Sequence, residues 1–148
     1  MKYEESGFMD NKCSLGSYIC KNKNELPIEK VESLLRQSDW AKDRKREDIY
    51  RSVENSTCYG VFDSQREMVG FARIITDYTT TFYLMDVIID EKYRGQGLGK
   101  MLMDAIMEDV GQLYGILHTD NAQKFYEKYG FHVTSTAETG ESVMEKVK

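Results

Sequence analysis

The sequence has little proline, few cysteines and no long apolar run. It contains 1 proline, 11 glycines and 3 cysteines in 148 residues. So little proline and glycine excludes a collagen-like chain and proline-rich disorder. Cys13, Cys20 and Cys58 are an odd number without a CxxC pair, which favours neither a disulfide scaffold nor a structural zinc site. No stretch approaches the ~20 apolar residues that a membrane-spanning helix needs.

The chain also lacks an excess of basic residues. It carries 20 Lys and Arg against 25 Asp and Glu, a net charge of −5. This balance argues against a nucleic-acid coat or an anionic membrane surface as the main partner. The charged residues 1–10 do not resemble a signal peptide. We therefore expect a protein of the reducing cytoplasm, with neither a nucleic-acid nor a membrane partner.

The length is that of one domain. A chain of 148 residues can bury roughly two thirds of its unfolded surface, which is enough for a core of its own. Hydrophobic residues make up 41% and charged residues 30%, a balance typical of globular proteins. We expect a single domain over residues 1–148, in which the polar residues 1–16 form an N-terminal stretch that no pattern assigns to an element.

Apolar periodicity predicts a mixed α/β fold. Pro27 suits the first turn of a helix, and Val31 and Leu35 follow it at helical spacing. Two β-rich runs around a polar five-residue connection predict an antiparallel hairpin. The predicted helices cover residues 27–37, 46–54, 96–110 and 121–129. The predicted strands cover residues 18–21, 57–62, 68–76, 81–89, 113–118, 131–134 and 142–147.

A glycine-rich segment lies between the apolar strand at 81–89 and the amphipathic helix at 96–110. It reads Arg94-Gly95-Gln96-Gly97-Leu98-Gly99-Lys100. The first N–H groups of a helix are unpaired and carry partial positive charge. Glycines let an anion approach the backbone, and Arg94 and Lys100 add full positive charges. The segment therefore predicts a site of the size of a diphosphate.

Three known loops compete for this segment. A P-loop needs glycine where Arg94 stands and Ser or Thr where Met101 stands, so it fails twice. A dinucleotide fingerprint needs a third glycine where Lys100 stands. The third pattern, [Arg/Gln]-x-x-Gly-x-[Gly/Ala], is matched in full by Arg94, Gly97 and Gly99.

This third pattern resembles the acyl-CoA pyrophosphate signature of the GCN5-related N-acetyltransferases, the GNAT family. Residues 84–102 are similar to the family's central strand, loop and helix start, and residues 121–131 are similar to its second signature. The resemblance implies a mixed, mostly antiparallel sheet with helices on both faces, splayed after the central strand. It also implies that acetyl-CoA donates an acetyl group to a primary amine of a small molecule or peptide by direct attack.

The resemblance assigns acetyl-CoA to two backbone stretches and one side chain. Backbone N–H groups over 94–99 hold the diphosphate, and those of Val87 and Ile89 pair with the pantetheine arm like an added strand. Asn121 contacts the CoA chain beyond the splay, although a plain helix N-cap is an equal alternative. The assigned residues are Val87, Ile88, Ile89, Arg94, Gly95, Gln96, Gly97, Leu98, Gly99, Lys100 and Asn121.

Two residues are candidates for the chemistry. By the resemblance, Tyr126 lies near the thioester sulfur and protonates the leaving thiolate; the alternative is a core aromatic. Asp86 interrupts an apolar strand and is a candidate general base, with a structural acid as the alternative. Asp77, or a carboxylate that acts through water, are the other candidate bases. No metal is expected, since His118 and His132 lack ligand spacing.

Other readings of the chain stay open at this point. The protein could bind acyl-CoA as a sensor or regulatory module without turnover, or, less well supported, be a phosphate-binding kinase-like protein. The family often forms dimers, so a homodimer is an open partner. We expect Trp40 to pack under the first two helices, with a wall of the acceptor site as the alternative. Cys58 is expected to be a buried small hydrophobe.

Overall fold

The computed structural model describes residues 16–148. Residues 1–15, which include Cys13 and nearly all of the unassigned N-terminal stretch, lie outside the described residues. The helices are α2 (Ile28–Leu35), α3 (Arg46–Glu54), α4 (Leu98–Val110) and α5 (Gln123–Glu127), with 3-10 turns η1 (Lys23–Glu25) and η2 (Glu91–Tyr93). The strands are β1 (Tyr18–Cys20), β2 (Thr57–Phe62), β3 (Met68–Thr76), β4 (Thr81–Ile89), β5 (Tyr114–Thr119), β6 (His132–Thr136) and β7 (Ser142–Lys146).

The strands form one sheet of seven, in the order β1-β2-β3-β4-β5-β7-β6. Neighbouring strands in residues 16–148 are antiparallel except β4 and β5, which run parallel. β2 and β3 form the hairpin that the sequence predicts, and α4 makes the connection from β4 to the parallel strand β5. The mostly antiparallel sheet is confirmed.

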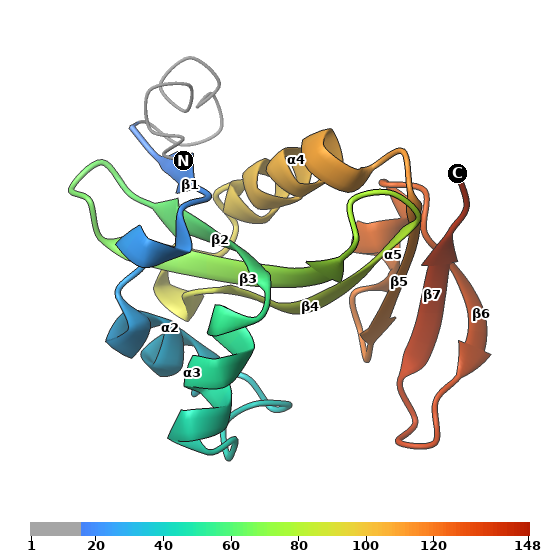
Figure 1. Cartoon of the computed structure of the whole chain (residues 1–148), viewed down its shortest axis with the longest axis horizontal. Helices are drawn as coiled ribbons and strands as arrows, with labels where there is room; N and C mark the ends of the chain where they lie inside the picture. The colour runs from blue at the N-terminus through green and yellow to red at the C-terminus, as the bar shows by residue number, and fades with distance from the viewer. Residues whose placement is uncertain (1–15) are drawn as a thin grey trace.

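Helices cover both faces of the sheet (Figure 1). α4 and α5 pack on one face, around a core that includes Leu102, Ile106 and Phe131. α2 and α3 lie on the other face, where Leu34 and Ile49 are fully buried. Each helix buries the apolar stripe that its sequence periodicity shows, which is why the sequence alone predicts both layers.

The sheet opens between β4 and β5. The two strands are paired only where Thr81–Tyr83 meet residues 114–116, although β4 continues to Ile89. Figure 1 shows the two strands diverging beyond this join. One edge of β4 after Tyr83 therefore has no neighbouring strand within the part of the chain that the structure describes. This is the splay that the resemblance implies.

Several element boundaries differ from the prediction. The helix predicted at 121–129 is only Gln123–Glu127, because the chain is still turning at Ala122, whose N–H donates to Thr119 Oγ1 over 3.1 Å. Ala122, and not Asn121, is the N-cap residue, so the N-cap alternative for Asn121 is wrong. The helix predicted from residue 96 begins at Leu98.

Two side chains outside the motifs test the packing predictions. Cys58 is 1% exposed, which confirms a buried small hydrophobe, and burial raises the pKa of its thiol to about 11. Trp40 is 52% exposed, so the prediction that it packs under the first two helices is wrong. None of the helices within residues 16–148 is long and apolar enough to cross a membrane.

Lys23 closes the C-terminal end of α3. Its ammonium group donates to the carbonyl oxygens of Val53 (3.2 Å), Glu54 (2.7 Å) and Ser56 (2.6 Å), which have no further turn of helix to bond. Replacing Lys23 by methionine is expected to lower the free energy of unfolding by about 2 kcal/mol, because charged hydrogen bonds to these carbonyls are lost. Urea denaturation measures the change. Lys30→Met, which loses only a 4.0 Å ion pair to Glu67, is the control and should change it by less than about 1 kcal/mol.

Candidate active site

The glycine-rich segment forms an exposed loop at the start of α4. Gly95 has a backbone φ of +80° and Gly97 one of +83°, both in the left-handed region that favours glycine. Gly97 is the N-cap of α4, and its carbonyl accepts the first bond of the helix from the N–H of Met101 at 3.1 Å. The N–H groups of Leu98, Gly99 and Lys100 therefore have no carbonyl within the helix to bond. An anion at this loop would meet unpaired donors at the positive end of a helix.

The basic side chains of the loop are already engaged. Arg94 Nε donates to the carbonyl oxygen of Ile89 at 3.0 Å, so its guanidinium group folds back over the end of β4. Lys100 forms an ion pair with Asp104 one turn along α4, at 2.7 Å. Both side chains are exposed, and their contacts lie at the surface, where such pairs cost little to exchange. The backbone N–H groups of the loop are therefore its main donors for an anion, and the charges of Arg94 and Lys100 add to them when their present contacts are exchanged.

The open edge of β4 leads away from this loop. The N–H of Asp90 donates to Val69 of β3 at 2.8 Å, so backbone groups at alternate positions along the strand face β3. The groups of Ile89 and Val87 face the other way, toward the splay, and an extended chain could pair with them there. Ile88 differs: its side chain is buried in the core under α2 and α3. The structure places Val87 and Ile89, but not Ile88, at the open edge.

Tyr126 lies on α5 with its ring almost fully buried at 8% exposure. Its ring centroid is 5.0 Å from that of Phe125 and 6.2 Å from that of Phe131. Burial raises the pKa of the Tyr126 phenol far above its ordinary value, so the hydroxyl keeps its proton at any working pH. Asn121, at the turn before α5, is exposed.

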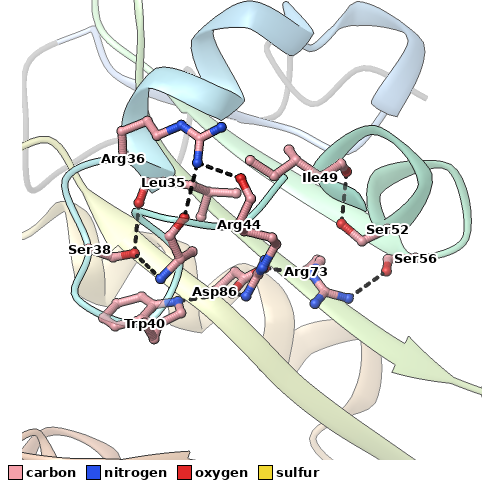
Figure 2. Close-up of polar contacts among 11 residues, drawn as sticks. Leu35, Arg36, Ser38, Trp40, Arg44, Ile49, Ser52, Ser56, Arg73 and Asp86 are labelled. Carbon is pink, nitrogen blue, oxygen red and sulfur yellow. Dashed lines mark hydrogen bonds and ion pairs between the residues drawn. The ribbon is translucent and has the colours of Figure 1, made fainter. Parts of the chain in front are cut away.

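Asp86 sits in β4 at a point where the strand is distorted. Its φ is +57°, in the left-handed region, and the pairing of β3 with β4 shifts register between Phe71 and Arg73. Such a bulge turns one residue out of the regular ladder. The side chain is 2% exposed, and its carboxylate accepts hydrogen bonds from Trp40, Arg44 and Arg73, as Figure 2 shows.

Asp77, the other candidate base, has a local role. Its carboxylate accepts hydrogen bonds from the Thr80 hydroxyl (2.6 Å) and from the N–H groups of Thr79 and Thr80 in its own turn. These bonds, the Thr80 hydroxyl foremost, lower the pKa of Asp77 far below its ordinary value. The carboxylate therefore closes the β3–β4 turn and is a poor proton acceptor near neutral pH.

The residues present fit a nucleotide cofactor with a diphosphate and an extended arm. A diphosphate would accept hydrogen bonds from the N–H groups at 98–100, beside Gly95, where an added Cβ would meet nothing within 4 Å. The arm would lie along the open edge of β4 at Val87 and Ile89. Within residues 16–148 no group of three or more His, Cys, Asp or Glu side chains is arranged to hold a metal ion.

Sequence reasoning considered Trp40 as a wall of the acceptor site, but it missed that Trp40, Arg44 and Arg73 are the hydrogen-bond partners of Asp86. Trp40 and Arg44 come from the connection between α2 and α3, and Arg73 from β3. A signal for one of them was present: Arg73 and Asp86 are the only charged residues in the two strands 68–76 and 81–89. Opposite charges isolated in two adjacent apolar strands are expected to pair, because a buried charge needs a partner. Nothing comparable marked Trp40 or Arg44.

A family profile described as "Acetyltransferase (GNAT) domain" matches residues 54–133. A solved structure of a Xanthomonas campestris pv. campestris protein assigned to the GNAT family is 35% identical in sequence. It superposes with a TM-score of 0.76 and covers 82% of this chain and 87% of its own. The matched residues hold the glycine loop, the splayed strand β4 and α5, which are the parts that build the candidate site.

Two further relatives differ more. The chain is 29% identical over 77 residues to "GCN5-related N-acetyltransferase 2, chloroplastic" of Arabidopsis thaliana, a match that covers 49% of this chain but only 30% of the relative. A solved aminoglycoside 6'-N-acetyltransferase in complex with coenzyme A is 19% identical, with a TM-score of 0.74 over 86% of this chain and 95% of that one. At this identity the second likeness concerns the fold.

Proposed function

Since the chain belongs to the GNAT acetyltransferase family, we propose that it is an acetyl-CoA-dependent N-acetyltransferase. It transfers the acetyl group to a primary amine of a small molecule or peptide by direct attack. A cytoplasmic location stays a prediction from the sequence, and a homodimer stays an open alternative that only the family resemblance suggests.

One observation carries the proposal: the exposed glycine loop at the start of α4 is continuous with the open edge of β4. The loop presents unpaired N–H groups at 98–100, and the edge presents the backbone of Ile89 and Val87. Together they match a ligand with a diphosphate at one end and an extended amide arm at the other. The solved aminoglycoside acetyltransferase with coenzyme A has the same fold and supports this assignment.

The chain's residues can serve each requirement of acetyl transfer. Acetyl-CoA supplies the acetyl group as a thioester. We assign to the backbone N–H of Val87, at the open edge after the bulge, the stabilisation of the negative charge that develops on the carbonyl oxygen. Tyr126 holds a proton on a buried hydroxyl and donates it to the departing thiolate. Holding both substrates in line supplies much of the remaining rate.

The pKa values of donor and acceptor need not match those in water. A free amine has a pKa of about 10.4 and must lose its proton before it attacks. A thiol has a reference pKa of about 8.5 and a phenol one of about 10. Burial raises the pKa of Tyr126, and a thiolate that forms in the same apolar surroundings is destabilised by the same cause. The proton can therefore still pass from the phenol to the sulfur as the bond breaks.

The test is thiol release from acetyl-CoA in the presence of a panel of amines. The panel contains aliphatic, aromatic and hydroxylated primary amines and short peptides with a free amino group. At least one should raise thiol release above the rate without amine, and mass spectrometry should show the amine heavier by one acetyl group. Tight binding of acetyl-CoA with no transfer to any amine would contradict the proposal and favour an acyl-CoA sensor.

A further inference from the structure

The connection between α2 and α3, residues 36–45, is held rigid by its own hydrogen bonds; we call it the α2–α3 loop. Arg36 Nη1 donates to the carbonyl oxygens of Ala41 (3.4 Å), Lys42 (2.9 Å) and Arg44 (2.6 Å). The Ser38 hydroxyl donates to Leu35 at 2.7 Å and accepts from the N–H of Ala41 at 3.1 Å. Figure 2 shows the bonds from Arg36 to Arg44 and from Ser38 to Leu35. A loop so well satisfied internally presents its side chains in a fixed arrangement.

Asp86 ties this loop to the sheet. Arg44 forms a two-pronged ion pair with it, Nη1 to Oδ2 at 2.7 Å and Nη2 to Oδ1 at 3.2 Å. Trp40 Nε1 donates to Oδ1 at 2.9 Å, and Arg73 Nε donates to Oδ2 at 2.7 Å from β3. Three side chains from two distant segments thus converge on one carboxylate, at the bulge of β4 (Figure 2).

These contacts disagree with a general base at Asp86. A base needs a free lone pair toward its substrate and a pKa near the working pH. Both oxygens of Asp86 already accept two hydrogen bonds each. Burial alone raises the pKa of the carboxyl, but the hydrogen bonds and charges of Arg44 and Arg73, the two charged side chains within residues 16–148 that contact it, outweigh burial and lower the pKa. Asp86 therefore stays ionised and occupied.

Trp40 is the part of the loop that a second substrate would meet. Its N–H end is fixed on Asp86, yet the side chain is 52% exposed. Because the polar end of the ring is anchored while the ring itself stays exposed, Trp40 offers a fixed apolar surface that a ligand can cover. The same face of the sheet is apolar nearby: Ile75, two residues from Arg73 on β3, is 51% exposed, and its partner on β4 is Tyr83. This face lies beside the bulge that precedes Val87.

We propose that Asp86 is a positioning residue rather than the base, and that it fixes Trp40 as one wall of the acceptor site. The wall suits amines whose amino group is attached to an apolar or aromatic arm, since the indole face offers apolar area and attraction to a nearby cation. This proposal rests on the proposed acetyltransferase function and names the acceptor class.

Kinetics with two amines test the wall. Against 2-phenylethylamine, Trp40→Leu is expected to raise the acceptor KM about tenfold, because one wall of apolar contact is lost. Its kcat and its KM for acetyl-CoA should stay within about twofold, and so should the KM for ethanolamine, which has no apolar arm. A Trp40→Leu enzyme whose KM for 2-phenylethylamine is unchanged would overturn the wall.

The matched variant Asp86→Asn tests positioning against catalysis. If Asp86 is a positioning residue, Asp86→Asn should raise the KM for 2-phenylethylamine, as Trp40→Leu does. The fall of kcat/KM at low pH, the acidic limb of the pH profile, should then be the same as in the wild type. A general base would give the opposite result: kcat lower by about 10² or more, no acidic limb, and an unchanged acceptor KM. That second result would overturn the proposal.

Tryptophan fluorescence gives a readout that needs no turnover, because Trp40 is the only tryptophan in the sequence. Asp86→Asn should shift the emission maximum and increase quenching by acrylamide, since the indole loses its anchor. An unchanged spectrum would overturn the anchor. If Asp86→Asn does not fold, Arg44→Gln removes the ion pair by changing its more exposed partner, and the same shift of emission and increase in quenching are expected. A wild-type protein that acetylates no amine, but whose fluorescence responds to these variants, contradicts the proposed function and not the anchor.

Discussion

Replacing Tyr126 by phenylalanine is expected to lower kcat about 10²-fold, while the KM for acetyl-CoA changes by less than about twofold. The change removes one hydroxyl and nothing else. The ring keeps its contacts with Phe125 and Phe131, so binding and packing are expected to survive. What is lost is the proton donor for the departing thiolate. The thiolate must then take a proton from water or leave as the anion.

The surroundings of Tyr126 make this prediction sharper. Among residues 16–148 only burial shifts the pKa of the Tyr126 phenol, so removing the hydroxyl breaks no charge interaction there, and the phenylalanine variant should melt within a few degrees of the wild type. Since burial raises the pKa of Tyr126, the phenol is protonated between about pH 6 and pH 9, and the wild-type profile should show no alkaline fall caused by this residue. Steady-state thiol release and a thermal melt measure both points.

Tyr129→Phe is the matched control for this experiment. Tyr129 follows α5, and its ring centroid lies 5.6 Å from that of Phe125, but the residue is less buried than Tyr126. It loses the same hydroxyl in the same aromatic cluster, and its kcat should stay within about twofold of wild type. If Tyr126→Phe and Tyr129→Phe have equal kcat values, Tyr126 has no part in the chemistry.

Replacing Gly97 by alanine is expected to raise the KM and the dissociation constant for acetyl-CoA about tenfold. At a φ of +83° an L-residue is strained by roughly 1–2 kcal/mol, and the backbone relieves the strain by rotating. Because Gly97 is the N-cap of α4, that rotation turns the N–H groups of Leu98 and Gly99 away from a shared anion. Acetyl-CoA titrations by calorimetry measure the loss directly, and kcat at saturation should change little.

The control for Gly97 is Gly140 in the turn between β6 and β7. Its φ is +98°, and an added Cβ would meet nothing within 4 Å. Gly140→Ala therefore imposes similar backbone strain away from the loop, and we expect the same affinity for acetyl-CoA as in wild type. Equal losses of affinity in the two variants would show that the effect comes from general destabilisation and not from the helix N-terminus.

The strands β2, β3 and β4 were predictable because each combines a strong local pattern with polar turns at both ends. Their observed bounds, Thr57–Phe62, Met68–Thr76 and Thr81–Ile89, are those that the sequence predicts. The start of α5 was predicted too early, since Asn121 suits an N-cap and Ala122 suits a helix interior, and only the bond from the Ala122 N–H to Thr119 Oγ1 shows that the helix begins later. Local patterns fix elements well and their ends poorly.

The glycine loop of the candidate site could be predicted because a contiguous motif carries it. The surroundings of Asp86 could not, since its partners Trp40 and Arg44 lie 46 and 42 residues away in a loop without regular structure. The exposure of Trp40 was mispredicted for the same reason: a tryptophan is usually buried, and only the fold shows that a carboxylate holds its N–H end at the surface.

The short stretch over which β4 and β5 are paired determines the width of the opening between the two strands at the candidate active site. On one side of it lie β1–β4 and on the other β5–β7, and β4 and β5 are paired at this join alone. Phe82 and Gly115 are partners in the join, and any side chain at Gly115 would collide with the Phe82 ring. A methyl group at Gly115 would push β5 away from β4 and widen the opening between them. The close contact of Phe82 with Gly115, where β4 and β5 are still paired, therefore sets the distance between the two strands at the site.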